Sequence, residues 1–528
     1  MKPFYITTAI DYSNGDPHLG HALEKVGADA IARWHRLRGE PVRFLMGMDE
    51  NAQKVIQAAE AAGRTPTEWL DAMSVRFEST WKRLECSHDI WMRTTSPNHA
   101  VGVKRLIELI LARHPDAFYQ GEYEGLYCVG CEEFKSDSQI VDGRCIEHPS
   151  RDLVPTKEQN TFFRLSAWRD GVLDAIRSGR FRVEPQIRRN EIVRLLEAGL
   201  IDISVSRSRV PWGVPFPGTA DQTVYVWFEA LMNYLTATTF ASPAGAPDWP
   251  ADIHVIGKGI SRFHCCIWPA ILLAADLPLP GMVWAHGYVQ WGGAKVSKSE
   301  GTSISLDAAI ERHGPDALRW FLLREVGFEN DGDFSIERFD ARYESDLANG
   351  LGNLAARVTA MIEKYRGGVV PGPSGAATHP SAALDATAAS NAPLDGRAAT
   401  PDSLDVYGLG RIADYSNAMD RNDLRGAAEI ISQLVSEANS HIVATAPWAL
   451  AKAGEEAKLD EALASLARCL VRLSVMASPF MPAKAKSLWT ALGQAGTPES
   501  GWAVAQTPEL GGARVSKPEN LFPKPNPA

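Results

Sequence analysis

The chain contains few cysteines and no long apolar run, and each absence excludes a class of protein. Its seven cysteines are an odd and small number for 528 residues, so they do not suggest the disulfide framework of a secreted domain. The most apolar stretch, from Cys265 to Ala275, is too short to cross a membrane. Asp11 and Asp16 interrupt the first apolar residues, which argues against a signal or transit peptide. We therefore expect a globular, cytoplasmic protein.

Positive charge is also scarce. The chain has 54 Lys and Arg against 64 Asp and Glu, a net charge of −10, which argues against a general polyanion binder but allows a local basic face. The 45% hydrophobic and 22% charged residues are typical of a globular chain with an ample core. The length predicts about two to four domains.

Short apolar runs alternate with helical periodicity in the first half of the chain. The runs 4–8 and 41–48 are each followed by a helical pattern, and strand-then-helix units resume at 223–231, 253–259 and 282–289. This alternation predicts an α/β fold with a doubly wound parallel sheet. Ligands bind such sheets beyond the carboxyl ends of the strands. Asp11, Tyr12 and Asp49 would lie there.

The stretch YITTAIDYSNGDPHLGH joins a strand to a helix through a turn. It ends with His18, Gly20 and His21 at the start of a long helical pattern. The two imidazoles, three residues apart, share one face of the first helical turn. Unpaired N–H groups and the helix dipole attract anions there. The pair suits a polyphosphate better than a metal, which would need a third ligand. The alternative is a pair of helix-start histidines without a role.

A Gly/Ser-rich loop far downstream, GGAKVSKSEGTS, carries two lysines. Lysine in a polar loop is common, so this loop alone is a weak signal. In this order, the two stretches resemble the paired ATP-binding motifs of class I aminoacyl-tRNA synthetases, usually His-Ile-Gly-His and Lys-Met-Ser-Lys-Ser. The resemblance implies that ATP is bound by His18, Gly20, His21, Lys295, Ser297 and Lys298.

Four further residues have the spacing of a metal site. They form a C-x2-C pair followed by a C-x2-H pair: Cys128, Cys131, Cys145 and His148. This spacing is typical of a closed tetrahedral zinc site, so it predicts one structural Zn²⁺ with no open position for catalysis. The alternative is that these cysteines are core residues of no special role. The segment is short and polar, however, and has little else around which to fold.

The pattern becomes helical beyond Phe334. The segment 370–403 interrupts it with Ala, Pro, Gly, Ser and Thr, a composition typical of a disordered or loosely packed linker. We expect helices again from about Tyr407 to Leu492, with the tail after Gly493 lying over the surface.

Within class I, the chain resembles the methionyl-tRNA synthetases, closely over 3–365 and more loosely over 405–490. The opening stretch, the zinc knuckle, VYVWFEALMNY followed by HVIGKGISRFH, and LANGLGNLAAR paired with APW carry the resemblance. It implies a split Rossmann-type catalytic sheet followed by a helical bundle. The predicted parts are a catalytic first half (1–115), a connective zinc-knuckle insert (116–222), a catalytic second half (223–290), a stem-contact region with the lysine loop (291–345) and an anticodon-binding domain (346–528).

The resemblance also implies two sets of binding residues. A methionine pocket would have a carboxylate for the ammonium group and aromatic and aliphatic side chains around the thioether. The residues implied for methionine are Ala9, Ile10, Tyr12, Asp49, Trp227, Ala230, Tyr234, Ile260 and His264. Those implied for the CAU anticodon are Asn353, Arg357 and Trp448, whose chemistry suits splayed bases. For any one of these aromatic residues, simple packing is the alternative.

The implied reaction has two steps. Methionine attacks the α-phosphate of Mg²⁺-ATP to give methionyl-adenylate and pyrophosphate, and methionine is then transferred to the 3′ adenosine of tRNA(Met) for translation initiation and elongation. No covalent enzyme nucleophile is needed, so catalysis depends on positioning and charge stabilisation. The implied catalytic groups are His18 and His21, which donate to phosphate, and Lys295 and Lys298, which neutralise the departing pyrophosphate.

Some positions depart from the family pattern. Asn51 replaces a common histidine, Gly259 replaces an aspartate, and Val296 replaces methionine. The chain also has no room after Ala528 for the C-terminal OB-type domain through which many bacterial relatives dimerise. We therefore expect a monomer.

Three alternatives compete with this interpretation. Synthetases for isoleucine, valine or leucine carry a larger editing insert than this chain has. A cysteinyl enzyme would present its zinc in the active site. A synthetase-like protein that binds RNA or makes an adenylate without charging tRNA would lack the lysine loop or the anticodon residues, and both are present.

Overall fold

The computed structural model describes residues 2–13, 15–128, 133–135, 139–146, 148–208, 212–219, 221–240, 242, 247–291, 294–295, 305–372, 401–518 and 521–524. The chain divides into two compact units. The first unit comprises Met1–Pro17, Arg43–Thr80 and His88–His286. The second unit comprises His18–Val42, Trp81–Ser87 and Gly287–Ala528. The domain boundaries expected from the sequence stay predictions.

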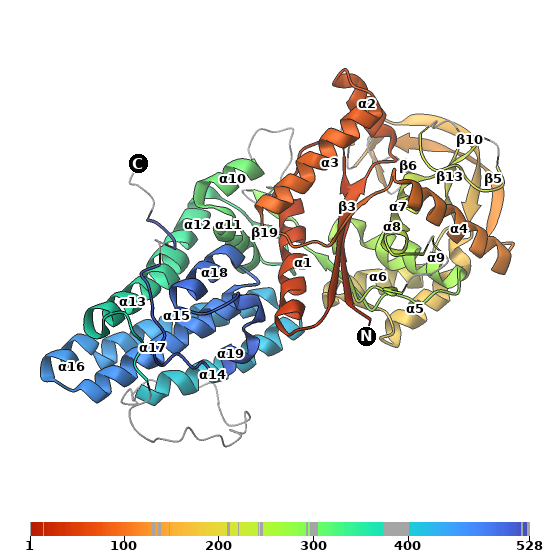
Figure 1. Ribbon diagram of the computed structural model, residues 1–528. Helices are drawn as coiled ribbons and strands as arrows, with labels where there is room; N and C mark the ends of the chain where they lie inside the picture. The colour runs from red at the N-terminus through yellow and green to blue at the C-terminus, as the bar shows by residue number, and fades with distance from the viewer. Residues whose placement is uncertain are drawn as a thin grey trace. The chain divides into compact units, whose positions relative to one another are not determined.

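A seven-stranded sheet forms the centre of the first unit (Figure 1). The strand order is β11-β16-β15-β1-β3-β2, and β4 also pairs with β3. The pairings with a described register are parallel, which confirms the predicted sheet. The strands are β1 (Phe4–Thr8), β2 (Asp11–Tyr12), β3 (Val42–Asp49), β4 (Ile90–Arg93), β11 (Arg182–Glu184), β15 (Ile253–Gly257) and β16 (Met282–His286).

Apolar runs form the central strands because helices cover both faces of the sheet. All five residues of β16 and the first four of β15 are buried, the pattern of a parallel strand enclosed on both sides. Phe163, Phe181 and Trp268 are among the largest side chains in this core. The helices of this part are α2 (Gln53–Ala61), α3 (Pro66–Arg83), α4 (Pro97–Arg113), η2 (Leu165–Trp168), α5 (Arg169–Arg177), α6 (Gln186–Ala198), α7 (Val226–Leu231), α8 (Asn233–Thr236), η3 (Lys258–Ile260), the π-helix η4 (Phe263–Ile267) and α9 (Trp268–Ala274).

The predicted insert contains antiparallel strands. One sheet has the order β12-β10-β5-β6, formed by β5 (Phe118–Cys128), β6 (Glu133–Lys135), β10 (Val154–Phe163) and β12 (Ile203–Ser204). A smaller sheet contains β7 (Ile140–Val141), β8 (Arg144–Cys145) and β9 (His148–Asp152), and β13 (Ser206–Arg207) pairs with β14 (Thr223–Val224). β11, although within 116–222, pairs with β16 in the central sheet. The insert is therefore partly built into the catalytic sheet.

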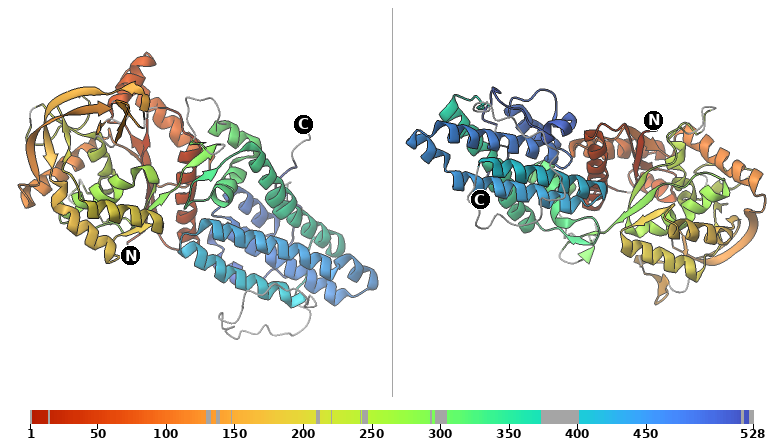
Figure 2. Two further views of the ribbon diagram at one scale, coloured as in Figure 1. Left: turned by 180° about the vertical axis from the view of Figure 1, so that it is seen from behind. Right: turned by 90° about the horizontal axis from the view of Figure 1, so that it is seen from below.

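The second unit is largely helical, which confirms the predicted C-terminal helical part. Figures 1 and 2 show α13, α14, α15 and α17 running alongside one another. Its helices are α1 (Leu19–Leu37), α10 (Leu306–His313), α11 (Pro315–Phe321), the π-helices η5 (Leu322–Val326) and η6 (Tyr343–Gly352), α12 (Ile336–Arg342), α13 (Asn353–Arg366), α14 (Pro401–Asp420), α15 (Leu424–Thr445), α16 (Pro447–Ala453), α17 (Glu456–Ala477), α18 (Pro482–Ala491), η7 (Pro498–Ser500) and α19 (Trp502–Gln506).

The start of the predicted linker is hydrogen-bonded to the C-terminal tail in the second unit. The backbone N–H of Val370 donates to the carbonyl of Ala513 at 2.9 Å. α14 begins at Pro401, earlier than the expected Tyr407, and most of the predicted linker lies outside the described residues. A small sheet here has the order β18-β17-β19, from β17 (Val289–Trp291), β18 (Ala294–Lys295) and β19 (Gly332–Asp333).

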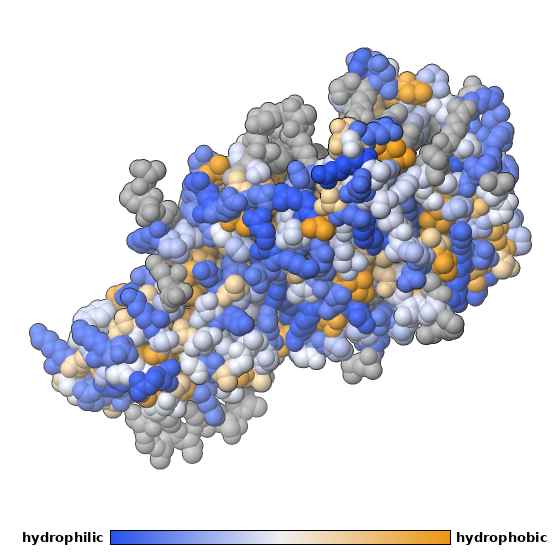
Figure 3. Space-filling model, turned by 45° about the horizontal axis from the view of Figure 1, so that its top comes forward, coloured by the Kyte–Doolittle hydropathy of each residue, from blue (hydrophilic) through white to orange (hydrophobic). Residues whose placement is uncertain are grey.

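Among the described residues, no helix combines the length and the hydrophobicity needed to cross a bilayer. Figure 3 shows a face on which hydrophilic residues predominate and hydrophobic residues are scattered between them.

Candidate active site

A small cavity lies beyond the carboxyl ends of β1, β3 and β15. β1 lies between the other two strands in the sheet, so the cavity is at the point where the chain changes direction along the sheet. Its volume is about 40 Å³, room for only one or two water molecules, so a larger ligand requires the walls to move. The cavity is lined by Ala9, Ile10, Asp49, Trp227, Ala230, Leu231, Asn233, Tyr234, Ile260, Phe263 and His264. All the residues predicted for methionine are among them except Tyr12.

Aromatic rings form one wall of the cavity. The ring centroids of Trp227 and Phe263 are 5.3 Å apart. Tyr12 stacks on Trp227, with centroids 5.8 Å apart and an interplanar angle of 11°, so it supports this wall from behind. The Lys54 ammonium lies 5.5 Å from the centre of the Tyr12 ring, at cation–π distance. Such a wall offers polarisable surface to a thioether.

Tyr234 and His264 form a hydrogen-bonded pair in the lining. Nδ1 of His264 lies 3.0 Å from the carbonyl oxygen of Ile260, which can only accept, so Nδ1 carries the proton. Nε2 then accepts a hydrogen bond from the Tyr234 hydroxyl at 2.6 Å. Beside Tyr234, burial lowers the pKa of His254 well below its usual value, and His264 lowers it further. His254 is therefore neutral at physiological pH.

Acidic residues follow β3. Asp49 ends this strand, with 2% of its surface exposed. The next residue, Glu50, is bound by the Arg93 guanidinium and the Thr95 hydroxyl. Burial raises the pKa of Glu50, although these two partners oppose the shift. Of the two carboxylates, only Asp49 lines the cavity, where it would complement a cationic group of a ligand.

Asn51 links the end of β3 to α7. Its Nδ2 donates to Oε1 of Glu229 at 3.0 Å and to the carbonyl of Thr94 at 3.0 Å. Nε2 of His99 also contacts Oε1 of Glu229, and both of these side chains are fully buried. Asn51 thus supplies a hydrogen bond where the family commonly has histidine, and it adds no charge.

His18 and His21 begin α1 in the second unit. The two rings stack with centroids 3.7 Å apart. Nδ1 of His18 accepts from the N–H groups of Gly20 and His21, and the N–H of His18 donates to Nδ1 of His21. With each Nδ1 used as an acceptor, the ring proton is on Nε2 in both neutral rings. Both can therefore act as donors to an anion through Nε2.

Gly20 is needed because the His18 ring covers it. A Cβ at position 20 would lie 3.0 Å from Cε1 and 3.1 Å from Nδ1 of this ring. An alanine at position 20 would therefore push this ring by a few tenths of an ångström and disturb the capping interaction of His18.

The lysine loop is described only at its start. Lys295 ends β18, and its Cα pairs with that of Gln290 on β17. Ser297 and Lys298 lie outside the described residues, and so do Val296 and Ser299.

Two of the four predicted zinc ligands have a described environment. Cys128 at the end of β5 and Cys145 in β8 are buried, and neither forms a disulfide. His148 in β9 is the strand partner of Cys145, and β9 lies beside β5. Cys131 and the His148 side chain lie outside the described set, and within that set no metal-binding group of three or more residues is found. Buried thiols on β5 and β8, two strands that both neighbour β9, fit the predicted donor set.

The predicted anticodon residues lie on two helices of the second unit. Asn353 and Arg357 are one turn apart on α13, and Trp448 on α16 is 49% exposed. Nη1 of Arg357 donates to Oδ1 of Asn439 on α15 at 3.1 Å. An exposed indole and a held guanidinium can both stack on an unpaired base.

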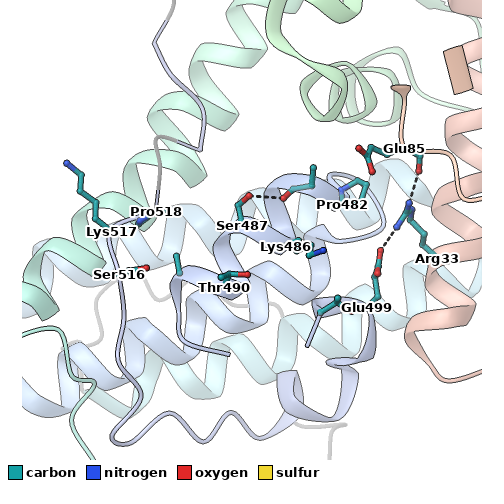
Figure 4. A pocket seen from close by; sticks show the side chains of 13 residues that line it. Arg33, Glu85, Pro482, Lys486, Ser487, Thr490, Glu499, Ser516, Lys517 and Pro518 are labelled. Carbon is teal, nitrogen blue, oxygen red and sulfur yellow. Dashed lines mark hydrogen bonds and ion pairs between the residues drawn. The ribbon is translucent and has the colours of Figure 1, made fainter. Parts of the chain in front are cut away.

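A larger cleft of about 740 Å³ lies among α1, α18 and the tail in the second unit (Figure 4). Arg33 on its wall is bonded to Glu499 and to the carbonyl of Glu85, and Lys517 points away from this group. The Glu499 carboxylate offsets the charge of Arg33, so this arginine is not available as an anion-binding group.

Leu231, Asn233 and Phe263 line the cavity but were not predicted from the sequence. Asn233 follows Ala230 by three residues, a spacing that brings side chains to one helix face. Phe263 directly precedes His264 in a π-helical turn, and such turns are frequent at functional sites. Helical spacing was the available signal, but it does not tell a lining residue from a core residue.

Two family models match the chain. One, described as tRNA synthetases class I (M), matches residues 4–152 and 150–359. The other, the anticodon binding domain of methionyl tRNA ligase, matches residues 402–526.

Relatives match nearly the whole chain. A protein named methionine–tRNA ligase from Caldanaerobacter subterraneus is 39% identical, over 99% of this chain and 79% of its own. One of the same name from Brucella suis is 37% identical, over 99% and 98%. Among solved structures, Mycobacterium tuberculosis methionyl-tRNA synthetase in complex with methionyl-adenylate aligns with a TM-score of 0.90 and 36% identity, over 99% of this chain and 100% of its own.

Proposed function

The chain belongs to the methionyl-tRNA synthetase family, and from this membership we propose that it joins methionine to tRNA(Met) in two steps, with ATP as the energy source. The observation that carries the proposal is the cavity beyond β1, β3 and β15. It combines one buried carboxylate, Asp49, with aromatic and aliphatic walls and the hydrogen-bonded pair Tyr234 and His264. This chemistry fits an amino acid with a positive ammonium group and an uncharged thioether.

In the first step, the methionine carboxylate attacks the α-phosphate of ATP, and the bond to pyrophosphate breaks. Asp49 holds the ammonium group, which orients the carboxylate. The remaining residues proposed for methionine binding surround the side chain: Ala9, Ile10, Tyr12, Trp227, Ala230, Tyr234, Ile260 and His264. A cavity of about 40 Å³ is too small for this side chain, so binding is accompanied by movement of the aromatic wall.

Charge stabilisation on the phosphates comes from two places in the chain. His18 and His21 donate through their Nε2 protons to phosphate oxygens at the N-terminal end of α1, where the helix dipole favours an anion. Lys295 and Lys298 neutralise the departing pyrophosphate, with Gly20 and Ser297 completing the ATP contacts. Mg²⁺ enters with ATP and neutralises part of the phosphate charge.

In the second step, the terminal ribose hydroxyl of tRNA attacks the carbonyl of methionyl-adenylate and releases AMP. We assign recognition of the anticodon to Asn353, Arg357 and Trp448 in the second unit. The exposed indole supports this assignment, since base stacking on aromatic side chains contributes about 1–3 kcal/mol per base.

The proposal includes one structural zinc ion, held by Cys128, Cys131, Cys145 and His148. Zinc would fix the small strands β8 and β9 against the end of β5 and would take no part in the reaction. We further propose a monomer that works in the cytoplasm, where translation uses its product. Light scattering of the purified chain tests the monomer against its mass of 57.6 kDa.

The first test is ATP–pyrophosphate exchange with each of the twenty amino acids, using the wild type and Lys298→Ala. We expect exchange with methionine and a rate at least about 100-fold lower in the variant, because one charge that stabilises the transition state is lost. Lys458→Ala, at an exposed lysine of α17, serves as a control for a lysine outside the phosphate motif.

Exchange with another amino acid would overturn the methionine assignment but retain the class. Absence of exchange with all twenty would favour the alternative protein that binds RNA without activating an amino acid. Undiminished exchange in Lys298→Ala would remove the lysine loop from the mechanism.

A further inference from the structure

Asn233, which lines the methionine cavity, carries a side-chain acceptor that no described residue satisfies. The residue begins α8, lines the cavity and has 0% of its surface exposed. Its Oδ1 accepts no hydrogen bond from the residues that the structure describes. A buried acceptor left unpaired costs about 1–3 kcal/mol, so such an atom in a binding cavity points to a missing donor.

The orientation of this amide is fixed by its other end. The Asn233 side-chain nitrogen donates to the carbonyl oxygen of Ala230 at 2.6 Å. A carbonyl can only accept, so exchanging the nitrogen and oxygen of the amide would place two acceptors together. Oδ1 is therefore the unpaired atom.

The helix that carries Asn233 is held firmly in place. Glu229, one turn earlier, is bonded to Asn51 and His99, and Nδ1 of His99 lies 2.6 Å from the Thr236 hydroxyl. These contacts attach α7 and α8 to the end of β3 and to α4. Asn233 is thus preorganised, since its position does not depend on a ligand.

We propose that Asn233 is a further substrate-binding residue, whose Oδ1 accepts a hydrogen bond from the α-ammonium group of the bound amino acid. An ammonium group has three N–H donors, so a second acceptor beside the Asp49 carboxylate can also be used. Asp49 supplies the opposite charge, and Asn233 on α8 supplies a neutral acceptor. Together they select a primary ammonium over an uncharged substituent. This inference rests on the proposed assignment of the cavity to methionine.

The test compares two inhibitors of ATP–pyrophosphate exchange that differ in this group. Methioninol keeps the ammonium group and lacks the carboxylate, whereas des-amino methionine keeps the carboxylate and lacks the ammonium group. In Asn233→Ala we expect the inhibition constant of methioninol to rise about tenfold, because the lost bond involves a charged donor. That of des-amino methionine should change by less than about twofold.

Two further variants make the result specific. Asn233→Leu removes the acceptor but keeps the side-chain volume, so it tests the proposal if the smaller residue impairs folding. It should show the same selective loss, with KM for methionine rising more than kcat falls. Asn160→Ala is the matched control, because Asn160 is equally buried, also has an Oδ1 without a partner among the described residues, and lies on β10 outside the cavity lining. It should leave both inhibition constants unchanged.

Equal weakening of both inhibitors would overturn the inference, since Asn233 would then only shape the cavity. Unchanged affinity for methioninol would overturn it too, with water as the donor to Oδ1. In both cases the methionine cavity would stand. If the wild type bound neither inhibitor nor methionine, the assignment of the cavity itself would fail, together with the inference.

Discussion

Asp29 on α1 is a buried carboxylate whose negative charge is compensated by arginine side chains of the second unit. Its carboxylate lies 2.8 Å from Nε of Arg33 and 2.7 Å from Nη2 of Arg319. Ser87 donates to it from both its N–H and its hydroxyl group. Burial alone would raise the pKa of Asp29, but the two arginines and Ser87 together hold it well below its usual range.

Asp29→Asn should destabilise the second unit by about 3–5 kcal/mol, because Arg319 is fully buried and would lose its counter-charge. The folded pKa is depressed, so this contribution is present above the unfolded value near 3.8 and is lost as the pH falls through the folded pKa. Urea unfolding should therefore show a large difference between wild type and variant at pH 7, which shrinks below about pH 4.

Asp340→Asn is the control at this scale. Asp340 also faces arginine, at Arg312, but its side chain is 36% exposed, so its loss should cost at most about 1 kcal/mol. If the two variants lost the same free energy of unfolding, burial would not be the reason why Asp29 matters.

At the scale of elements, the small strands of the insert have little apolar core of their own. β7, β8 and β9 have only two, two and five residues. Cys145 is buried in β8, whereas Val141 and Ile146 beside it are exposed. Elements this short need a further restraint, and the proposed zinc site would provide it.

Elemental analysis of the purified protein should find about one zinc per chain. The Cys145→Ser variant should lose the metal, and its insert should become sensitive to proteolysis. Cys266 is also buried but lies in the π-helix η4, so the Cys266→Ser variant should retain the metal. A metal-free wild type, purified without chelator and resistant to proteolysis, would refute the zinc assignment.

At the scale of the whole molecule, the two proposed recognition tasks lie in different units. The methionine cavity is built entirely from residues of the first unit, and the three anticodon residues belong to the second. Methionine activation requires no anticodon. The two tasks should therefore be separable by mutation.

Trp448→Ala should raise KM for tRNA(Met) about 10- to 100-fold, the effect of losing one stacked base. ATP–pyrophosphate exchange should stay at the wild-type rate, because the cavity is untouched. Val406→Ala, which changes another exposed apolar residue of the second unit, should alter neither assay. Normal charging by Trp448→Ala would remove the indole from anticodon recognition.

Local features were predictable because neighbouring residues determine them. The turn before His18, the start of α1 at Leu19 and the strand ending at Asp49 follow from turn residues and apolar periodicity. Two patterns far apart in the chain were enough to indicate ATP chemistry, since each binding motif is continuous in sequence.

What the sequence alone determined is thus the strand-and-helix order, the family and most of the cavity lining. Tertiary structure decided the remainder: that β11 joins the central sheet, that Asn51 bonds Glu229, and that Oδ1 of Asn233, a lining residue, has no partner among the described residues. These properties depend on burial and on hydrogen-bond partners far away in the chain. Periodicity reports which face a residue occupies, but it does not report which atoms meet it there.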